Sequence, residues 1–150
     1  MSQGRSIVAF VWNNFQNDAR VLRECRAWAE AGYAVTLVAL LDPERPALPP
    51  PQERDGFTVL RVDRHTGPTR WLRRIGGRSP VGKLGTLLGY GIGMIRMMRA
   101  GRRLRADLYH ANDLNTLPQA AFCAKWFRRR RRQVPLVYDS HEVQTSRTGY

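Results

Sequence analysis

The chain has 150 residues, of which 43% are apolar, and its formal net charge is +13. This length matches a single domain, and the apolar fraction can form one core without disulfide support. The two cysteines, Cys25 and Cys123, fit neither a metal-binding motif nor a disulfide framework, so we expect a reducing, cytoplasmic compartment. No stretch approaches the ~20 apolar residues that span a bilayer, and the apolar run 7–12 is too short for a signal peptide.

The positive charge is concentrated in two segments. Residues 61–105 contain eleven arginines and one lysine against the single acid Asp63, and residues 128–132 are all arginine. The rest of the chain is slightly acidic. A basic surface confined to two segments indicates a local anionic partner, which is an anionic membrane surface, a nucleic acid or an acidic substrate.

The amino-terminal residues predict a strand followed by a helix. The run 7–12 is continuously apolar and rich in β-branched and aromatic residues, as is typical of a strand buried on both faces. Asn17 or Asp18 can cap the next helix by accepting a hydrogen bond from its free N–H groups. Apolar residues recur at helical spacing over 21–29, and Gly32 ends the helix.

The middle of the chain predicts two strands, two loops and a long helix. Segment 35–41 is a second buried strand, and the prolines of segment 42–56 predict a loop that ends in an Asp-Gly turn. Segment 57–62 is a third strand. Residues 64–105 form a basic loop up to Ser79 and then a long helix, in which four glycines lower the intrinsic helix propensity by up to ~1 kcal/mol each.

The last third predicts a strand, a helix and a final strand. Segment 108–110 is short and apolar, and Thr116 can cap a helix that has Pro118 in its first turn. Segment 135–139 is the fifth strand. The chain has no internal repeat and no clear domain boundary, so we expect one domain over residues 1–150.

These elements predict an α/β fold with a Rossmann-like parallel sheet of about five strands and helices on both faces, because parallel neighbours need crossover connections. The expected strand order is 3-2-1-4-5, which opens a crevice between the first and fourth strands. Three polar loops would converge on that crevice, at residues 13–14, 110–113 and 139–142. We therefore expect a ligand site at the carboxyl ends of the strands.

Two common nucleotide sites are missing from the sequence. A dinucleotide site needs G-x-G-x-x-G after the first strand, where this chain has Asn13 to Asp18 without a glycine. The chain also has no G-x-x-x-x-G-K-[ST] phosphate loop. We therefore expect no cofactor and no metal in this domain.

Three stretches together resemble the amino-terminal, acceptor-side domain of family 4 glycosyltransferases. Residues 18–24 (DARVLRE), running on to 31–38 (AGYAVTLV), are similar to the opening of that family. Residues 107–118 (DLYHANDLNTLP) resemble its strand-4 motif, and residues 137–142 (VYDSHE) resemble its strand-5 motif. The order and spacing of these stretches agree with the family.

The resemblance implies one half of a GT-B architecture, in which two Rossmann-like domains face each other. In such enzymes the amino-terminal domain holds the acceptor and the carboxyl-terminal domain holds the nucleotide sugar, the donor substrate. The resemblance implies a retaining, hexosyltransferase-like enzyme that acts on a glycan or lipid-linked acceptor in polysaccharide or glycolipid biosynthesis. We expect the carboxyl-terminal donor domain to be absent here and supplied in cis or in trans, so that this chain alone is inactive.

His141 matches a position where the family places a histidine near the reacting sugar. An imidazole can hydrogen-bond a sugar hydroxyl or stabilise charge near the anomeric carbon. The alternative is a histidine that orders its loop through Asp139 or Glu142. We take His141 as the candidate catalytic residue, and Asp139 and Glu142 as candidate acceptor-binding residues.

The other candidate acceptor-binding residues have structural alternatives of equal weight or more. His110 and Asp113 are candidates, although Asp113 is also well placed to cap the following helix. Asn13 and Asn14 can bind hydroxyls, and we favour the alternative that they make the turn. Asp18 and Arg20 are interpreted as a cap and a surface pair rather than as parts of the site.

The preferred role of the basic segments is docking to an anionic membrane surface, which makes the protein peripheral on the cytoplasmic face. Each basic residue near such a surface contributes about 1 kcal/mol. A nucleic-acid-binding module is the main alternative, considered unlikely because it leaves the polar loops unexplained. A non-catalytic interaction domain is the third. The candidate membrane-surface residues are Arg70, Trp71, Arg73, Arg74, Arg78, Arg99, Arg102, Arg103, Arg128, Arg129, Arg130, Arg131 and Arg132.

Overall fold

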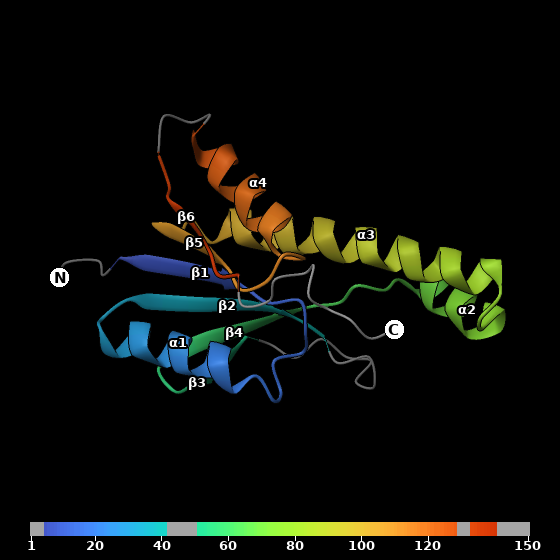
Figure 1. The fold of residues 1–150 in the computed structure, drawn as a ribbon, viewed down its shortest axis with the longest axis horizontal. Helices are drawn as coiled ribbons and strands as arrows, with labels where there is room; N and C mark the ends of the chain where they lie inside the picture. The colour runs from blue at the N-terminus through green and yellow to red at the C-terminus, as the bar shows by residue number, and fades with distance from the viewer. Residues whose placement is uncertain (1–4, 42–50, 129–132, 141–150) are drawn as a thin grey trace.

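A six-stranded sheet forms the centre of the protein, with helices on both of its faces (Figure 1). The computed structural model describes residues 5–41, 51–128 and 133–140. The strands are β1 (Ser6–Phe10), β2 (Ala34–Leu40), β3 (Gln52–Arg54), β4 (Phe57–Val62), β5 (Leu108–Ala111) and β6 (Leu136–Tyr138). The helices are α1 (Ala19–Glu30), α2 (Gly67–Gly76), α3 (Pro80–Arg103) and α4 (Leu117–Arg128).

The strands lie in the order β3-β4-β2-β1-β5-β6. All neighbours are parallel except β3 and β4. The five predicted strands are therefore confirmed in the predicted order, with one further strand at the edge. The order reverses at β1, which pairs with β2 on one side and with β5 on the other.

The prediction of a loop throughout 42–56 is wrong at its carboxyl end, because Gln52–Arg54 forms the antiparallel edge strand β3. Asp55 and Gly56 join β3 to β4 with φ angles of 50° and 82°. Two successive positive φ angles are the signature of a two-residue type I′ hairpin turn, which Asp-Gly favours. Residues 42–50 lie outside the described part of the chain.

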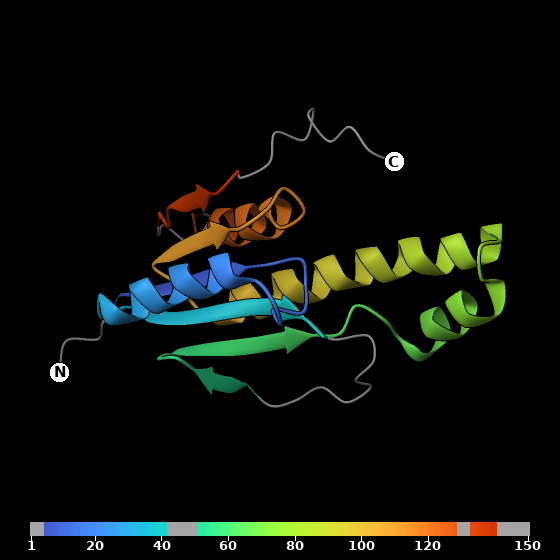
Figure 2. The same ribbon diagram turned by 60° about the horizontal axis from the view of Figure 1, so that its bottom comes forward.

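The two faces of the sheet carry separate cores. On one face, alternate β1 residues such as Ile7 and Ala9 pack with Val21 and Cys25 of α1. On the other face, Phe10 and its neighbours pack with residues of α3 and α4. Figure 2 shows α1 on one side of the sheet and α3 with α4 on the other. Each strand residue therefore has a fixed face, and polar residues at the strand ends are held between two packed layers.

The prediction of a turn-rich loop over 64–79 is also wrong, because residues 67–76 form α2. Thr66 and Thr69 start this helix reciprocally. The Thr66 N–H donates to Thr69 Oγ1 at 2.8 Å, and the Thr69 N–H donates to Thr66 Oγ1 at 3.4 Å. These bonds satisfy backbone donors that a helix start leaves unpaired, and Pro68 fits the first turn.

The glycines of α3 lie on the face that packs against the rest of the protein. A Cβ at Gly89 would lie 2.6 Å from the His65 ring, and a Cβ at Gly101 would overlap the Phe10 ring. Their low helix propensity is therefore offset by close packing. Gly91, by contrast, has open space around it.

The helix pair α2 and α3 projects from the sheet. The amino-terminal half of α3 and all of α2 extend beyond the carboxyl ends of the strands (Figures 1 and 2). We call residues 67–95 of this pair the hairpin. No helix in the described ranges is long and apolar enough to cross a membrane.

Candidate functional site

The carboxyl ends of β1, β5 and β6 meet at the crevice that the reversal of strand order creates. The Asn112 backbone N–H and its side-chain amide each donate to the Phe10 carbonyl at 3.1 Å. The Asp139 N–H donates to the Ala111 carbonyl at 2.9 Å. The loops after these three strands are thus tied to one another, as the sequence predicts. His141 and Glu142 lie outside the described residues.

The side chains of Asn13 and Asn14 shape the loop after β1. Asn13 Oδ1 accepts from the Phe15 N–H at 2.8 Å, and Asn14 Oδ1 accepts from the Gln16 N–H at 3.3 Å. Phe15 itself has a φ of 53°, so the loop passes through the left-handed region there. These bonds are those of Asx turns, the alternative that the sequence favoured for both residues.

A polar hollow of about 590 Å³ lies beside this loop and the start of α1. Asp18 caps α1 by accepting from the Val21 N–H at 3.2 Å, and it also accepts from the Asn13 amide at 3.0 Å. Amides, carboxylates and guanidinium groups can donate to and accept from hydroxyls. The lining residues are Asn13, Asn14, Gln16, Asn17, Asp18, Ala19, Arg20 and Arg23.

Asp113 fixes the loop after β5. Its Oδ2 accepts from the Trp12 N–H at 3.2 Å, and its Oδ1 accepts from the Thr116 N–H at 3.0 Å. The Thr116 hydroxyl accepts from the Asp113 backbone N–H at 3.3 Å and donates to the Asp113 carbonyl at 2.9 Å. Both carboxylate oxygens are therefore engaged in joining this loop to the end of β1, and the role of Asp113 toward an acceptor stays a prediction.

His110 lies inside the sheet rather than at its rim. The side chain is 5% exposed in β5 and packs edge-on against the Trp28 ring of α1, with 4.9 Å between ring centroids. This position places His110 beneath α1, one to two residues before the loop that reaches the crevice. Its contact with an acceptor stays a prediction.

Arg20 connects α1 to the ends of β5 and β6. Its guanidinium lies 3.2 Å from the Asp139 carboxylate and donates to the Asn112 carbonyl at 3.4 Å. The same Nη1 lies 4.0 Å from Glu24 Oε1, one helical turn along α1. One arginine therefore contacts three segments that are far apart in the sequence.

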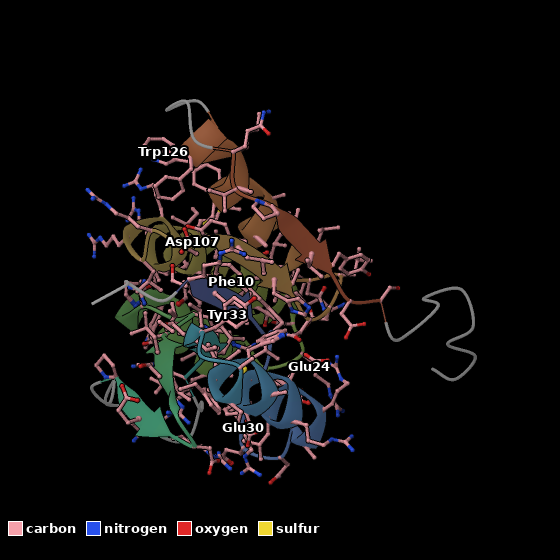
Figure 3. All side chains as sticks on the ribbon, turned by 90° about the vertical axis from the view of Figure 1, so that its left-hand side faces the viewer. Phe10, Glu24, Glu30, Tyr33, Asp107 and Trp126 are labelled. Atoms are coloured by element: carbon pink, nitrogen blue, oxygen red, sulfur yellow. The ribbon has the colours of Figure 1, made fainter. Side chains whose placement is uncertain are left out.

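Glu24 lies between this arginine and Asp139, on a different side of α1 from Glu30 (Figure 3). Burial, followed by a hydrogen bond with Asp139, raises the pKa of Glu24 from 4.5 to about 7, although Arg20 opposes the rise. A carboxyl group that binds a proton near neutral pH beside a second carboxyl is typical of functional sites. We call Arg20, Glu24 and Asp139 the carboxyl cluster.

The described residues contain no group of three His, Cys, Asp or Glu side chains that could hold a metal ion. Burial raises the pKa of Cys25 and of Cys123 to about 12, so both thiols stay protonated at neutral pH. The chemistry that this crevice offers is therefore the chemistry of amides, carboxyls and a guanidinium.

Comparison with known proteins adds to this geometry. The sequence matches the model of the glycosyl transferase 4-like domain over residues 18–149. The chain belongs to glycosyltransferase family 4. A search of curated protein sequences found no significant match.

The fold of this family 4 domain is similar to part of sucrose-phosphate synthase from Thermosynechococcus elongatus, with a TM-score of 0.54 and 12% identity. The match covers 94% of this chain and 34% of that protein. The chain thus spans about a third of its structural relative. At this identity the likeness concerns the fold, which is one Rossmann-like half of a GT-B architecture.

The candidate membrane-surface residues of the family 4 domain that the structure describes lie on α2, α3 and α4 or just before α3. Arg70 forms an ion pair of 2.5 Å with Asp63, and Arg102 stacks over the Trp126 ring at 4.5 Å. Trp71, which is 60% exposed, lies on α2 with the exposed Arg74. Arg129, Arg130, Arg131 and Arg132 lie outside the described residues. The remaining candidates are Arg73 in α2, Arg78 just before α3, Arg99 and Arg103 in α3, and Arg128 at the end of α4.

Sequence reasoning missed Arg20 and Glu24 as site residues, because it assigned Arg20 to a surface pair on α1. A signal was present: the two residues are four apart, so they share a helix face directly after the loop that follows β1. The third residue of the carboxyl cluster, Asp139, is 119 residues away from Arg20 in the sequence. Asp139 was predicted as a candidate, but no sequence pattern indicates its contact with α1.

Proposed function

We propose that this chain is the acceptor-binding half of a retaining glycosyltransferase, and that the acceptor lies at the polar hollow and the adjoining crevice. The hollow beside the start of α1 is the observation that carries the proposal. It places amides, Asp18 and Arg20 around a space large enough for a sugar unit, at the carboxyl ends of the strands. Membership of family 4 supports the reaction class.

The chemistry of the hollow suits neutral, hydroxyl-rich groups. Asn13 and Asn14 use their side-chain oxygens within the loop, and the side-chain N–H groups of Asn14 are donors at the hollow. Asp18 and Arg20 add one acceptor group and one cation. Several weak hydrogen bonds of this kind select among hydroxyl arrangements rather than binding tightly.

His141 is the proposed catalytic residue, in hydrogen-bonding distance of the acceptor or the anomeric centre during reaction. It follows the carboxyl cluster in sequence, two residues after Asp139. In the proposal, Asp139 and Glu142 stand beside it, while the carboxyl-terminal domain, in cis or in trans, brings the nucleotide sugar. Polysaccharide or glycolipid biosynthesis on the cytoplasmic face of a membrane is the proposed setting.

Transfer assays test the division of labour between two domains. The purified chain, incubated with UDP-glucose or GDP-mannose and either methyl glycosides or a lipid extract as acceptor, is expected to give no glycosylated product. Addition of a donor-binding domain of the same family should restore transfer. Clear turnover by the 150-residue chain alone would contradict the proposal.

Membrane docking through the hairpin is the second part of the proposal. It rests on exposed apolar side chains among the exposed cations Arg74, Arg78 and Lys83, which form no ion pair within the described residues. Between Asp63 and Asp107 the sequence has no acidic residue. The apolar side chains that the hairpin exposes are Trp71, Ile75, Val81, Leu84, Leu87, Leu88 and Ile95. Apolar residues that enter the interface beside basic residues are the usual means of peripheral binding.

A second hollow lies along the hairpin and supports a lipid-linked acceptor. It measures about 600 Å³, and its lining includes Arg78, Lys83, Leu87 and Tyr90. The Tyr90 hydroxyl donates to Asn115 at 2.9 Å, and its ring packs against the Trp12 ring in a tilted arrangement with 4.5 Å between centroids. One lining residue of the hollow therefore contacts residues that follow β1 and β5.

Co-sedimentation with vesicles tests the docking. Vesicles that contain phosphatidylglycerol should bind the chain, and vesicles of phosphatidylcholine alone should not. Trp71→Ser combined with Leu87→Ser should abolish binding, whereas Leu114→Ser, at an exposed apolar site outside the hairpin, should not. A salt-sensitive shift with RNA and no vesicle binding would instead favour the nucleic-acid alternative.

A further inference from the structure

The carboxyl cluster joins α1 to the exit of β6, and its internal contacts form without a bound acceptor. Arg20 and Glu24 come from α1, and Asp139 is the first residue after β6. All three side chains are about one-third exposed or less, with exposed fractions of 34%, 27% and 32%. The cluster is therefore partly shielded from water, which strengthens its internal interactions.

The charges of the cluster do not balance when both carboxyls are ionised. Two carboxylates then face one guanidinium, and Asp18 adds a third negative charge nearby. Glu24 Oε2 is buried, and within the described residues no donor reaches it. The Glu24 and Asp139 carboxyls approach the same guanidinium nitrogen, Arg20 Nη1, at 4.0 and 3.2 Å, so they are neighbours. Two carboxyl groups can bond to each other only when a proton lies between them.

We propose that Glu24 and Asp139 share one proton and, together with Arg20, form a clamp that holds the exit of β6 against α1. These three are positioning residues, because they act on the backbone that leads from the sheet into the following segment. The clamp would affect catalysis through His141, which follows Asp139 by two residues, and this effect rests on the proposed function. The clamp itself does not rest on the proposed function.

The clamp is sensitive to pH in a defined direction. With the proton in place, Glu24 donates to Asp139, and Asp139 accepts from Arg20 as well. The pKa of Glu24, about 7, sets the pH at which this proton leaves. Above this pH the carboxylates of Glu24 and Asp139 repel each other. Of the charged neighbours that act on Glu24, Asp139 and Asp18 are negative and Arg20 is the one cation. The exit of β6 should then loosen.

Two readouts test the clamp without any assay of glycosyl transfer. The first is the titration of the Glu24 side-chain carboxyl by carbon-detected NMR, which should centre near neutral pH. Asp139→Asn should move this midpoint down, because it removes the negative charge of Asp139, which together with burial raises the pKa of Glu24, and Arg20→Met should move it up. A midpoint at the ordinary value of a glutamate in the wild-type chain would overturn the proposal.

The second readout is hydrogen exchange at the Asp139 amide, which is bonded to the Ala111 carbonyl. After correction for intrinsic rates, its protection should fall about tenfold between about pH 6 and about pH 8, the change that one pK unit of coupling gives. Glu24→Gln retains a donor toward Asp139 and should remove the pH dependence while keeping the protection. Glu24→Ala should lose the protection at both pH values.

Glu30→Gln is the matched control, since it removes the same charge from the exposed end of α1. It should leave both readouts unchanged. Equal effects of Glu30→Gln and Glu24→Gln would show a general charge effect and overturn the clamp. Failure of the chain to bind acceptor would contradict the proposed function and leave both readouts as they are, so the two failures are distinguishable.

Discussion

The carboxyl cluster and the hairpin use arginine in opposite ways. In the cluster, Arg20 contacts two carboxyls and a backbone carbonyl from three segments. On the hairpin, Arg70 alone among the described side chains has a carboxylate partner, while Arg74, Arg78 and Lys83 are exposed among apolar side chains. In the first arrangement the guanidinium is paired with groups of the protein itself, and in the second the cations are exposed to a partner.

This difference shows that net charge indicates a partner only after internal pairs are removed. Arg20 contributes to the net charge of +13, yet its guanidinium bonds to Asp139 and to the Asn112 carbonyl and so joins α1 to the ends of β5 and β6. Arg74, Arg78 and Lys83 of the hairpin form no ion pair within the described residues. Their charge therefore acts over the Debye length, about 8 Å at physiological salt, on whatever surface approaches.

Charge reversal on the hairpin should have the largest effect. Arg74→Glu, Arg78→Glu and Lys83→Glu together should weaken binding to anionic vesicles by about 3 kcal/mol or more, over a hundredfold, because each basic residue contributes about 1 kcal/mol. A control that reverses Arg5, Arg105 and Lys125, which are exposed and form no ion pair within the described residues, changes the net charge equally outside the hairpin. Equal losses in the two variants would show that net charge, rather than the hairpin, is recognised.

The next largest effect should come from α3, which belongs to both the core and the hairpin. Gly101→Ala should destabilise the fold by about 1–3 kcal/mol, because its Cβ would overlap the fully buried Phe10 ring and lie 3.0 Å from Cys123. Gly91→Ala meets open space and should stabilise by up to about 1 kcal/mol through helix propensity. Urea unfolding measures both, and a stable Gly101→Ala variant would contradict the packing described.

Glu24→Gln should have a smaller effect that depends on pH. The folded-state pKa of about 7 lies above the ordinary 4.5, so between these values the folded protein binds the proton more tightly than the unfolded chain does. The contribution of Glu24 is therefore fully present below about pH 4.5 and is lost as the pH rises through about 7. The variant should exceed the wild type in stability by about 1 kcal/mol at alkaline pH, after discount for partial exposure. A wild-type stability independent of pH over this range would contradict this.

Arg70→Gln should have the smallest effect, below about 1 kcal/mol, because it removes an exposed ion pair with Asp63. Arg74→Gln removes the same charge from the same helix without an ion pair in the described residues. Unfolding at low and high salt separates the two variants, since the loss at Arg70 should shrink as salt rises. A loss of several kcal/mol would place Arg70 in the core of the hairpin rather than on its surface.

The central fold was predictable because most of its strands are short, mainly apolar segments bounded by turn residues. That signal identified β1, β2, β4, β5 and β6 and their order. The edge strand β3 was missed because Gln52–Arg54 has no apolar residue, and it pairs through an Asp-Gly turn instead. The helix α2 was missed because its basic, glycine-flanked sequence has a short apolar face and its stability comes from packing on α3.

The site was predictable as a place but not as a set of contacts. Polar residues after β1, β5 and β6 were identified because strand ends of one sheet meet at one edge. The bonds of Asp113 to Trp12 and of Arg20 to Asp139 join residues more than 100 positions apart. Periodicity carries no information on such pairs, because it reports the face of an element and not its partner across the sheet.

Amide NMR of the labelled chain tests the central claim most directly, using methyl glycosides of glucose, mannose and galactose and, separately, UDP-glucose. At least one glycoside should shift residues around the polar hollow, from Asn13 to Arg20, together with Asn112 and Asp139. UDP-glucose should shift none of these residues. Binding of the nucleotide sugar at the hollow, with no response to any glycoside, would contradict an acceptor-side role for this domain.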